Sequence, residues 1–255
     1  MGPSHAPVQM LWVGGPLTTL ERLSLTSWLA HGHEVHLYTY GRPANTPRGL
    51  RIMDAAEILP QQPGTQNSHF GAAPTRFTDL FGYSLLHARG GIWAEIDVVC
   101  LRPLDFAGGM DYFFASEMLP PQAGDGDKIR VRSSGCVMKA PAGSPLVEDC
   151  LAAARTAADT PENPLTGPLL LHAAVEKFNM TSALLNPNLF CPIPFFNMPA
   201  LISGMATLPP ESYGVHLWNE SWRRNLFDRN ADYDPLSLYE RLKTHYLGRR
   251  GPSHA

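Results

Sequence analysis

Two acidic side chains stand two residues apart in the segment 90–97 (GGIWAEID). On an extended strand, alternate side chains leave the same face, so Glu95 and Asp97 would lie about 7 Å apart at the backbone with both carboxylates on one side. Such carboxylates repel each other unless a hard divalent cation lies between them and a phosphate. A cation bound there can neutralise a departing diphosphate and make it a better leaving group. The ordinary alternative is an edge strand with two solvent-facing acids.

The residues around the pair favour a ligand site over that alternative. The acids follow a Gly-Gly turn, and we expect them on a strand over 92–99, opposite an apolar face. That apolar face would consist of Ile92, Ala94, Ile96 and Val98. A strand that buries one face and presents two acids at its end places them in the crevice where α/β sheets bind ligands.

Alternating strands and helices must position this segment. Apolar alternation predicts strands over 7–13, 34–40, 50–53, 112–116, 129–139 and 213–218. Caps, apolar stripes and Gly or Pro stops predict helices from Thr18 or Thr19 to Gly32 and over 74–90, 144–158, 168–178 and 235–247. A loop rich in Pro, Gln and Gly is expected at 60–71. The pattern predicts an α/β fold with a mainly parallel central sheet, helices on both sides, and a small C-terminal helical and loop extension.

Composition limits the class of protein. With 255 residues, of which 44% are hydrophobic and 17% charged, the chain can bury the core of one domain, which we place at 7–247. A net charge of −3 and scattered basic residues argue against a nucleic-acid partner. No apolar run approaches the roughly 20 residues of a membrane span, and the N-terminus does not resemble a signal peptide. We therefore expect a cytoplasmic protein.

Two further features concern the ends of the chain and its cysteines. The pentapeptide Gly-Pro-Ser-His-Ala occurs at 2–6 and again at 251–255, so residues 1–6 and 248–255 are interpreted as flexible tails. The four cysteines, at 100, 136, 150 and 191, form no CxxC pair. They are expected to be free buried thiols, as in a reducing compartment.

The segment 90–103 (GGIWAEIDVVCLRP) resembles the signature of glycosyltransferases with a DXD sugar-binding motif, family 32 and its relatives, and more distantly the glucosyltransferase domain of large clostridial toxins. The family pattern is Gly-Gly-x-Tyr-x-Asp-x-Asp, so Trp93 stands for the usual Tyr and Glu95 for the first Asp. The resemblance implies a GT-A-like fold in which Asp97 and Glu95 bind Mn²⁺ or Mg²⁺, and in which Trp93 and both acids contact a nucleotide-diphosphate sugar. Glu95 keeps the charge but reaches one methylene further than Asp, which makes Asp97 the firmer metal ligand.

The segment 10–15 (MLWVGG) resembles the first strand of the same family. The resemblance implies that Trp12 lies against the base of the donor, with Val13 and Gly14 beside it. Its place at the end of a strand before Gly-Gly suits a stacking role. From the residues alone, Trp12 would be a core side chain.

The segment 76–83 (RFTDLFGY) resembles the family helix that faces the donor sugar. Asp79 matches the acid that accepts hydrogen bonds from sugar hydroxyls, although an exposed helical acid is the ordinary alternative. Gly82 replaces the family's Arg, and Gly within a helix costs about 1 kcal/mol relative to Ala. Either a neighbour packs closely at Gly82, or Arg76 or Arg89 supplies the missing charge.

Two later segments complete the resemblance. Thr166-Gly167-Pro168 resembles a turn that begins a helix near the acceptor side. The segment 216–222 (HLWNESW) resembles the C-terminal His-x-x-x-x-Ser-Trp element that closes over the diphosphate. It implies His216 as a metal or phosphate ligand, Asn219 as a further metal ligand, and Ser221 and Trp222 as donor-binding residues; a lone His on an apolar strand is otherwise a core residue.

The resemblance implies a retaining hexosyl- or N-acetylhexosaminyltransferase that uses a UDP- or GDP-sugar, acts on a glycan, glycolipid or other hydroxyl acceptor, and serves polysaccharide biosynthesis. Its catalytic residues would be Asp97, Asp79 and Glu95, which act by positioning and electrostatics. Glu117, Asp125 and Asp127 would lie on the acceptor side.

Other functions stay open. Glu95 and Gly82 favour a nucleotide-sugar-binding protein without turnover, which metal-dependent donor binding in the absence of transfer would reveal. A metal-dependent phosphoester hydrolase would release phosphate from simple esters, but it does not account for Trp12 or Trp222. The helix at 235–247 carries Leu238 and Leu242 beside basic residues, so it is either a packed surface helix or a contact with an anionic membrane.

Overall fold

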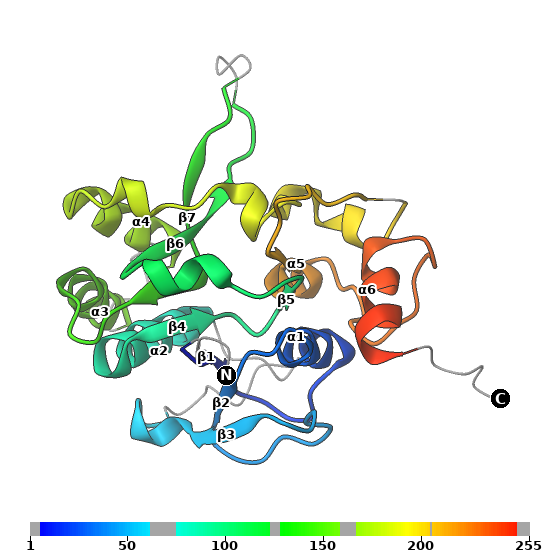
Figure 1. The fold of residues 1–255 in the computed structure, drawn as a ribbon, viewed down its shortest axis with the longest axis horizontal. Helices are drawn as coiled ribbons and strands as arrows, with labels where there is room; N and C mark the ends of the chain where they lie inside the picture. Colours follow the sequence, from blue (N-terminus) through cyan, green and yellow to red (C-terminus); the bar gives the residue numbers. More distant parts are fainter. Residues whose placement is uncertain (1–5, 62–74, 123–127, 159–166, 205, 249–255) are drawn as a thin grey trace.

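The computed structural model describes residues 6–61, 75–122, 128–158, 167–204 and 206–248 (Figure 1). Both predicted tails lie outside these ranges except for Ala6 and Gly248, and most of the predicted loop at 60–71 lies outside them as well. The strands are β1 (Val8–Trp12), β2 (Val35–Thr39), β3 (Arg51–Asp54), β4 (Gly91–Ala94), β5 (Val98–Cys100), β6 (Phe113–Met118), β7 (Val131–Ala140) and β8 (Gly214–His216). The helices are α1 (Thr19–Ala30), α2 (Thr75–Arg89), α3 (Pro145–Ala158), α4 (Pro168–Lys177), α5 (Asn219–Arg224) and α6 (Leu238–Leu247).

A six-stranded sheet forms the centre of the molecule, in the order β3-β2-β1-β4-β7-β6. The pairings β1–β2, β2–β3 and β1–β4 are parallel, whereas β4–β7 and β6–β7 are antiparallel. Parallel neighbours need crossover connections, and α1 and α2 follow β1 and β3 as such crossovers. The predicted α/β fold with a mainly parallel sheet is confirmed.

Helices cover both faces of this sheet. Along β1, Met10 and Trp12 belong to the core beneath α1, while Leu11 and Val13 belong to the core beneath α2, α3 and α4. This alternation follows from the two-residue period of a strand, because successive side chains leave opposite faces. Figure 1 shows α2, α3 and α4 gathered on one side and α1, α5 and α6 on the other. Both faces of β1, β2 and β4 are therefore largely buried, as is usual for parallel strands, whereas the edge strand β3 is mostly exposed.

The segment predicted as one strand over 92–99 is divided in two, so that prediction is wrong. β4 ends at Ala94, and Glu95, Ile96 and Asp97 form a turn in which the Val98 amide donates to the Glu95 carbonyl at 3.2 Å. β5 then leaves the main sheet and pairs antiparallel with β8 in a separate two-stranded sheet. The chain changes sheets here because the α1 side chains Ser24 and Trp28 both donate to the Val98 carbonyl.

Short helical turns that the sequence did not reveal lie between the longer elements: Ala55–Glu57 after β3, Asp105–Gly109 after β5, and Thr181–Ala183, Pro187–Leu189 and Phe195–Leu201 between α4 and β8. Helix α5 was also missed, because its six residues are too few for an apolar period to be recognised. The other predicted helices and strands that lie in the described ranges are present within a few residues of their expected bounds.

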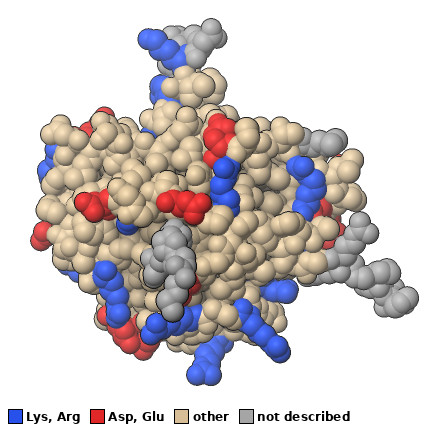
Figure 2. All heavy atoms as spheres, viewed as in Figure 1, with Lys and Arg blue, Asp and Glu red and all other residues tan. Residues whose placement is uncertain are grey.

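The surface and termini of the described chain fit the expectations from composition. Charged residues are scattered over the face seen in Figure 2, with Lys and Arg more frequent at its lower edge. Leu238 and Leu242 of α6 are buried, so these side chains hold the helix against the protein. Among the residues described, no helix combines the length and apolar character needed to cross a membrane. All four cysteines are free and buried, as predicted.

Candidate functional site

The Glu95–Asp97 turn lies where β4 ends, at the carboxyl edge of the parallel strands. Gly90, just before β4, and Gly91, its first residue, both have positive φ, and a Cβ on Gly90 would lie only 2.4 Å from the Ala142 amide nitrogen. Only glycine fits at this close approach. The turn is also fastened to β7, because the Glu95 amide donates to the Cys136 carbonyl at 2.8 Å. The Gly-Gly pair therefore sets where the two acids emerge.

His216 lies between the two carboxylates. Its Nε2 is 3.1 Å from Glu95 Oε2 and 3.2 Å from Asp97 Oδ2. The β5–β8 pairing produces this contact, because His216 stands opposite Val98, the residue after Asp97. One donor atom from each of these three residues lies within 4.8 Å of the others, which is close enough to share one metal ion. The turn thus brings both carboxylates to His216. The predicted strand would also have put the two acids on one side of the chain, although by a different geometry.

The charges at this cluster support one another. Asp97 and His216 are only 5% and 6% exposed, and burial alone would disfavour charge on either side chain. Despite burial, the Asp97 carboxylate holds the pKa of His216 well above its usual range. Despite the same burial, the His216 charge and hydrogen bond and the Asn219 amide hold the pKa of Asp97 below its usual range. Asp97 and His216 thus form an ionised pair, with the Glu95 carboxylate beside the imidazole.

Asn219 contributes its backbone to this cluster. Its amide donates to Asp97 Oδ2 at 2.7 Å, from the first position of α5. Trp218, the residue before it, has the left-handed φ of 61° that turns the chain from β8 into α5. The Asn219 side-chain oxygen instead accepts from Arg229 at 2.9 Å, and Arg229 pairs with buried Glu21. The predicted metal-ligand oxygen of Asn219 is therefore directed toward Arg229 in this structure.

The C-terminal tryptophan supports the site from the core. Trp222 is fully buried, and its Nε1 donates to the Leu217 carbonyl at 2.7 Å. Its ring lies 4.8 Å from that of Tyr239 in α6. Ser221, which like Trp222 belongs to α5, is partly buried, and its amide donates to the Trp218 carbonyl. Trp222 thus anchors the turn that carries His216 and the Asn219 amide.

Asp79 of α2 meets the beginning of α4. A Cβ on Gly167 would lie 2.9 Å from Asp79 Oδ2, and Gly167 has a φ of +61° that also favours glycine. Two of the segments that resemble the glycosyltransferase family are therefore adjacent, although Thr166 lies outside the described residues. Burial and the nearby Glu95 carboxylate raise the pKa of Asp79 to about 8. At neutral pH, Asp79 is a protonated acid that can donate as well as accept a hydrogen bond.

Gly82 packs against Trp93. A Cβ at Gly82 would lie 3.1 Å from Cε2 of the indole, tighter than ordinary side-chain contact. Trp93 is 2% exposed, and its ring also lies near Phe81. The close neighbour expected at Gly82 is thus present. Of the two arginines expected to replace the family's Arg, Arg89 pairs with Glu57 at 2.7 Å, and Arg76 is exposed at the start of α2.

A pocket of about 340 Å³ opens at the ends of β1 and β2. It is lined by Trp12, Val13, Gly14, Gly15, Thr39, Tyr40, Gly41, Arg42, Pro43 and Gln61. Trp12 is mostly buried in the core but contributes to the wall, and its Nε1 donates to the Gly15 carbonyl at 2.9 Å. Sequence reasoning missed Tyr40 and Arg42. The end of a second parallel strand beside the first was the available signal, because parallel strands end at one edge of a sheet.

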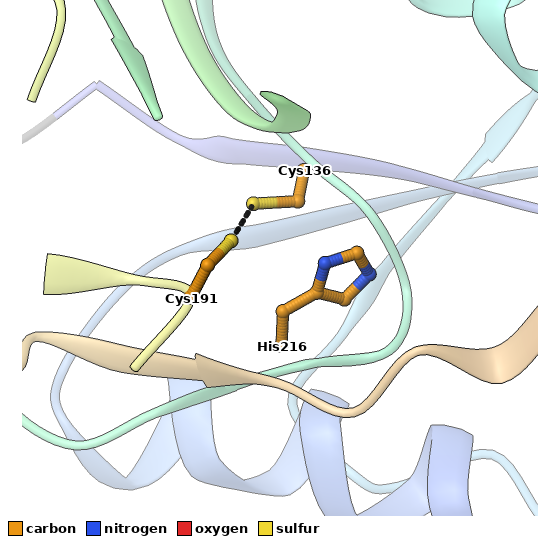
Figure 3. A group of neighbouring side chains, drawn as sticks. All are labelled: Cys136, Cys191 and His216. Atoms are coloured by element: carbon orange, nitrogen blue, oxygen red, sulfur yellow. Dashed lines mark hydrogen bonds between the residues drawn. The ribbon is translucent and has the colours of Figure 1, made fainter. Parts of the chain in front are cut away.

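Two cysteines that the sequence did not place in the site lie near His216. Cys136 of β7 and Cys191, which follows Pro187–Leu189, lie with their sulfurs 3.6 Å apart beside the imidazole (Figure 3). Glu117 of β6 is buried and pairs with Arg132 at 2.6 Å, while Asp125 and Asp127 lie outside the described residues. No spacing in the sequence links positions 136, 191 and 216, so only the fold brings them together.

Comparisons with known proteins return structural similarity alone. No protein-family model matches the chain, and no curated protein matches it. Among solved structures, it is similar to PaToxG glycosyltransferase at 14% identity, with a TM-score of 0.49 over 69% of this chain and 70% of that one. It is similar to the glycosyltransferase GlyE of Streptococcus pneumoniae TIGR4 at 12% identity, with a TM-score of 0.45 over 88% of this chain and 62% of that one. The apo form of GlyE gives 12% identity and a TM-score of 0.46 over 88% and 61%. The chain thus spans less than two thirds of the GlyE structures.

Proposed function

We propose that the protein is a retaining glycosyltransferase that moves a hexosyl or N-acetylhexosaminyl group from a nucleotide-diphosphate sugar to a hydroxyl acceptor. The observation that carries the proposal is the convergence of Glu95, Asp97 and His216 at the carboxyl edge of the parallel strands. α/β sheets bind their ligands at this edge. The pocket at the ends of β1 and β2 opens at the same edge and supplies the space for a nucleotide.

The donor set at the carboxylates fits a hard divalent cation such as Mn²⁺ or Mg²⁺. Carboxylate oxygens are the ligands that such ions prefer. In the structure, the protonated imidazole of His216 balances the negative charge of Glu95 and Asp97, as a bound cation would. Asp97 and Glu95 would hold the cation, with His216 and the Asn219 side chain as further candidate ligands. When bound, the cation would stabilise negative charge on the departing diphosphate.

The remaining residues would bind and orient the donor. The Trp12 indole and Tyr40 ring, which line the pocket, offer aromatic surface for the base, while Val13 and Gly14 leave room for the ribose. Asp79 would hydrogen-bond hydroxyls of the sugar, beside Gly167. Trp93 supports Asp79 indirectly by packing against Gly82 of the same helix. Ser221 and Trp222 would hold the α5 turn over the diphosphate.

In the proposed transfer, the acceptor oxygen bonds to the anomeric carbon on the face from which the diphosphate leaves. The bond between that carbon and the diphosphate oxygen breaks, and the acceptor's proton passes to the departing phosphate oxygen. Retention of configuration follows from attack on this face. Positioning and electrostatic stabilisation by the protein lower the barrier, without a covalent intermediate on a side chain.

Turnover of nucleotide sugars tests this proposal. Purified protein with Mn²⁺ is incubated with UDP- and GDP-sugars chosen by thermal shift, because a bound donor stabilises the folded chain by mass action. We expect slow release of nucleoside diphosphate, accelerated by an acceptor and lowered at least a hundredfold in Asp97→Ala. Asp111→Ala, which changes an exposed acid, is the matched control and should turn over as the wild type does.

Two outcomes would contradict the proposal. Metal-dependent donor binding without turnover, across a broad acceptor panel, would identify a nucleotide-sugar-binding protein. Equal turnover in Asp97→Ala and the wild type would separate the activity from this site. The proposal also includes a cytoplasmic location, contact with a membrane surface and a role in polysaccharide biosynthesis. The identity of the acceptor would test these parts.

A further inference from the structure

We propose that Cys136, Cys191 and His216 bind a zinc ion, separate from the cation of the two carboxylates. The three side chains come from β7, from the segment after Pro187–Leu189 and from β8, and all three are buried. One ligand atom from each lies within 4.8 Å of the others. Figure 3 shows the two sulfurs and one imidazole nitrogen directed toward a common space. This proposal does not rest on the proposed transferase activity.

The spacing of the sulfurs fits coordination by one ion. Cys136 Sγ and Cys191 Sγ are 3.6 Å apart. Two thiolates bound to zinc at about 2.3 Å with tetrahedral angles lie about 3.8 Å from each other. A disulfide requires a sulfur–sulfur distance of about 2.05 Å, so the observed pair is not bonded. Only a small adjustment would bring both sulfurs to one zinc ion.

An unsatisfied nitrogen marks the same space. His216 Nδ1 is buried and has no hydrogen-bond partner by distance and angle among the described residues. Buried polar atoms are usually hydrogen-bonded, so an unpaired one needs a physical reason. The sulfurs of Cys136 and Cys191 are the soft donors beside this ring. A metal ion that replaces the Nδ1 proton and accepts the lone pair of that nitrogen would satisfy it.

The other ring nitrogen already has the partner that a zinc-binding histidine requires. Metal-bound histidines almost always donate their second N–H to a carboxylate or carbonyl, which fixes the tautomer and the ring orientation. His216 Nε2 lies within hydrogen-bond distance of both Glu95 and Asp97. With zinc on Nδ1, the Nε2 proton is retained and donated to those acids. His216 then acts as a positioning residue, and Asp97 and Glu95 remain as the ligands of the second cation.

The donor chemistry separates the two ions. Thiolates and imidazole select zinc over Mn²⁺ or Mg²⁺, which prefer carboxylate oxygens. Binding displaces three protons to solvent, one from each thiol and one from Nδ1 of the protonated His216, and places a 2+ ion against two thiolates and one neutral imidazole. Three protein ligands leave one position of a tetrahedral zinc for water. Cys136, Cys191 and His216 are all buried, whereas Glu95, which contacts the other ring nitrogen of His216, has a side chain that is 24% exposed.

Zinc content measured on the full chain tests the proposal. Protein reduced, stripped of metal, reloaded with one equivalent of ZnCl₂ and desalted is analysed for zinc by mass spectrometry and for accessible thiols. We expect one zinc per wild-type chain, and at least a tenfold lower zinc content in Cys136→Ala and in Cys191→Ala. Cys150→Ala is the matched control, because Cys150 is equally buried but lies in α3, away from the cluster. It should bind zinc as the wild type does.

Wild-type protein loaded with Co²⁺ gives a second readout that does not depend on how the variants fold. We expect absorption from thiolate-to-cobalt charge transfer together with the intense visible bands of a tetrahedral site. The proposal is overturned if the wild type retains no zinc, if Cys136→Ala and Cys191→Ala retain as much as it does, or if the two thiols are isolated as a disulfide.

The two proposals can fail independently. Asp97→Asn should keep its zinc while losing Mn²⁺-dependent donor binding. If the wild type retains no zinc but still binds the donor, only the zinc proposal is overturned. If the wild type binds zinc but no nucleotide sugar, only the transferase proposal is overturned.

Discussion

Gly82 and Trp93 are in direct contact, so two positions at which the sequence differs from the glycosyltransferase pattern it resembles are neighbours in space. A Cβ on Gly82 would come within 3.1 Å of the indole. The indole at position 93 therefore disfavours a side chain larger than glycine at position 82, because the ring would have to shift to admit a Cβ. The missing arginine and the extra aromatic volume are one change in packing rather than two separate losses.

Substitution of Gly82 tests this coupling. In a helix, Gly82→Ala should gain about 1 kcal/mol of helix propensity, whereas overpacking against a buried ring costs about 1–3 kcal/mol. We expect Gly82→Ala to lower the free energy of unfolding by about 1 kcal/mol in the wild type. In a Trp93→Tyr background, the same change should raise it by about 0.5–1 kcal/mol. Urea unfolding of the four proteins measures the coupling, and additive effects would contradict it.

The length of the acid at position 95 can be separated from its charge. Glu95→Gln removes the charge, and we expect it to weaken Mn²⁺-dependent donor binding by about 10- to 100-fold. Glu95→Asp shortens the side chain by one methylene and should stay within tenfold of the wild type, because a carboxylate remains on the same turn. Thermal shift at several donor concentrations, with and without Mn²⁺, measures both. Tight metal-dependent binding in Glu95→Gln would show that Asp97 alone suffices.

Asp79 should make stability depend on pH. Its pKa is raised to about 8 by burial and by Glu95, so the folded chain keeps a proton that the unfolded chain releases near pH 4. The unfolded state therefore binds fewer protons between these values, and stability falls as pH rises from about 4 to 8. Because Asp79 is partly exposed, we expect a loss of about 1–2 kcal/mol, below the full equivalent of the shift.

Asp79→Asn cannot ionise and is the variant for this measurement. Urea unfolding at pH 5, 6.5 and 8, without divalent metal, should give a shallower decline in stability for Asp79→Asn than for the wild type. Asp111→Asn, at an exposed acid, should follow the wild type. If the stability of Asp79→Asn and of the wild type declines equally with pH, a group other than Asp79 is responsible for the decline.

Arg42 lines the pocket at the end of β2 and is exposed. If the donor's phosphates lie at this edge of the sheet, Arg42→Ala should raise KM for the donor about three- to tenfold with kcat within twofold, because an exposed ion pair contributes about 1 kcal/mol. Stability should change by less than about 0.5 kcal/mol. Arg48→Ala, at an exposed position outside the pocket lining, serves as control. An effect that persists undiminished in high salt would argue against a phosphate contact.

The sequence was sufficient for those elements whose signal is local. β1, α1 and β2 each carry a complete apolar period, and Thr18 with Glu21 forms the expected cap of α1. The single strand over 92–99 was wrong because alternation continues through Glu95 and Asp97 even though the chain turns there. Hydrogen bonds from Ser24 and Trp28 decide that turn, and neither is visible as periodicity.

The candidate site divides in the same way. The acids, Asp79 and His216 were found from their motifs, and the contact of Gly167 with Asp79 joins two of these motifs. Tyr40, Arg42, Cys136 and Cys191 were missed because each reaches the site only through the tertiary fold, and no local spacing connects it to the motifs. Asn219 was chosen for its side chain, whereas its backbone amide makes the contact with Asp97.

The β5–β8 sheet also determines when the site can form during folding. The contact between His216 and Asp97 joins residues 119 positions apart, while β1, β2 and β3 are consecutive in the chain. Closing so long a loop is slow, since its entropy must be lost before the contact forms. We expect the parallel strands to assemble first and the carboxylate cluster to become complete only when β8 docks. A chain emerging from the ribosome would therefore form its parallel sheet before the cluster of Glu95, Asp97 and His216 is assembled.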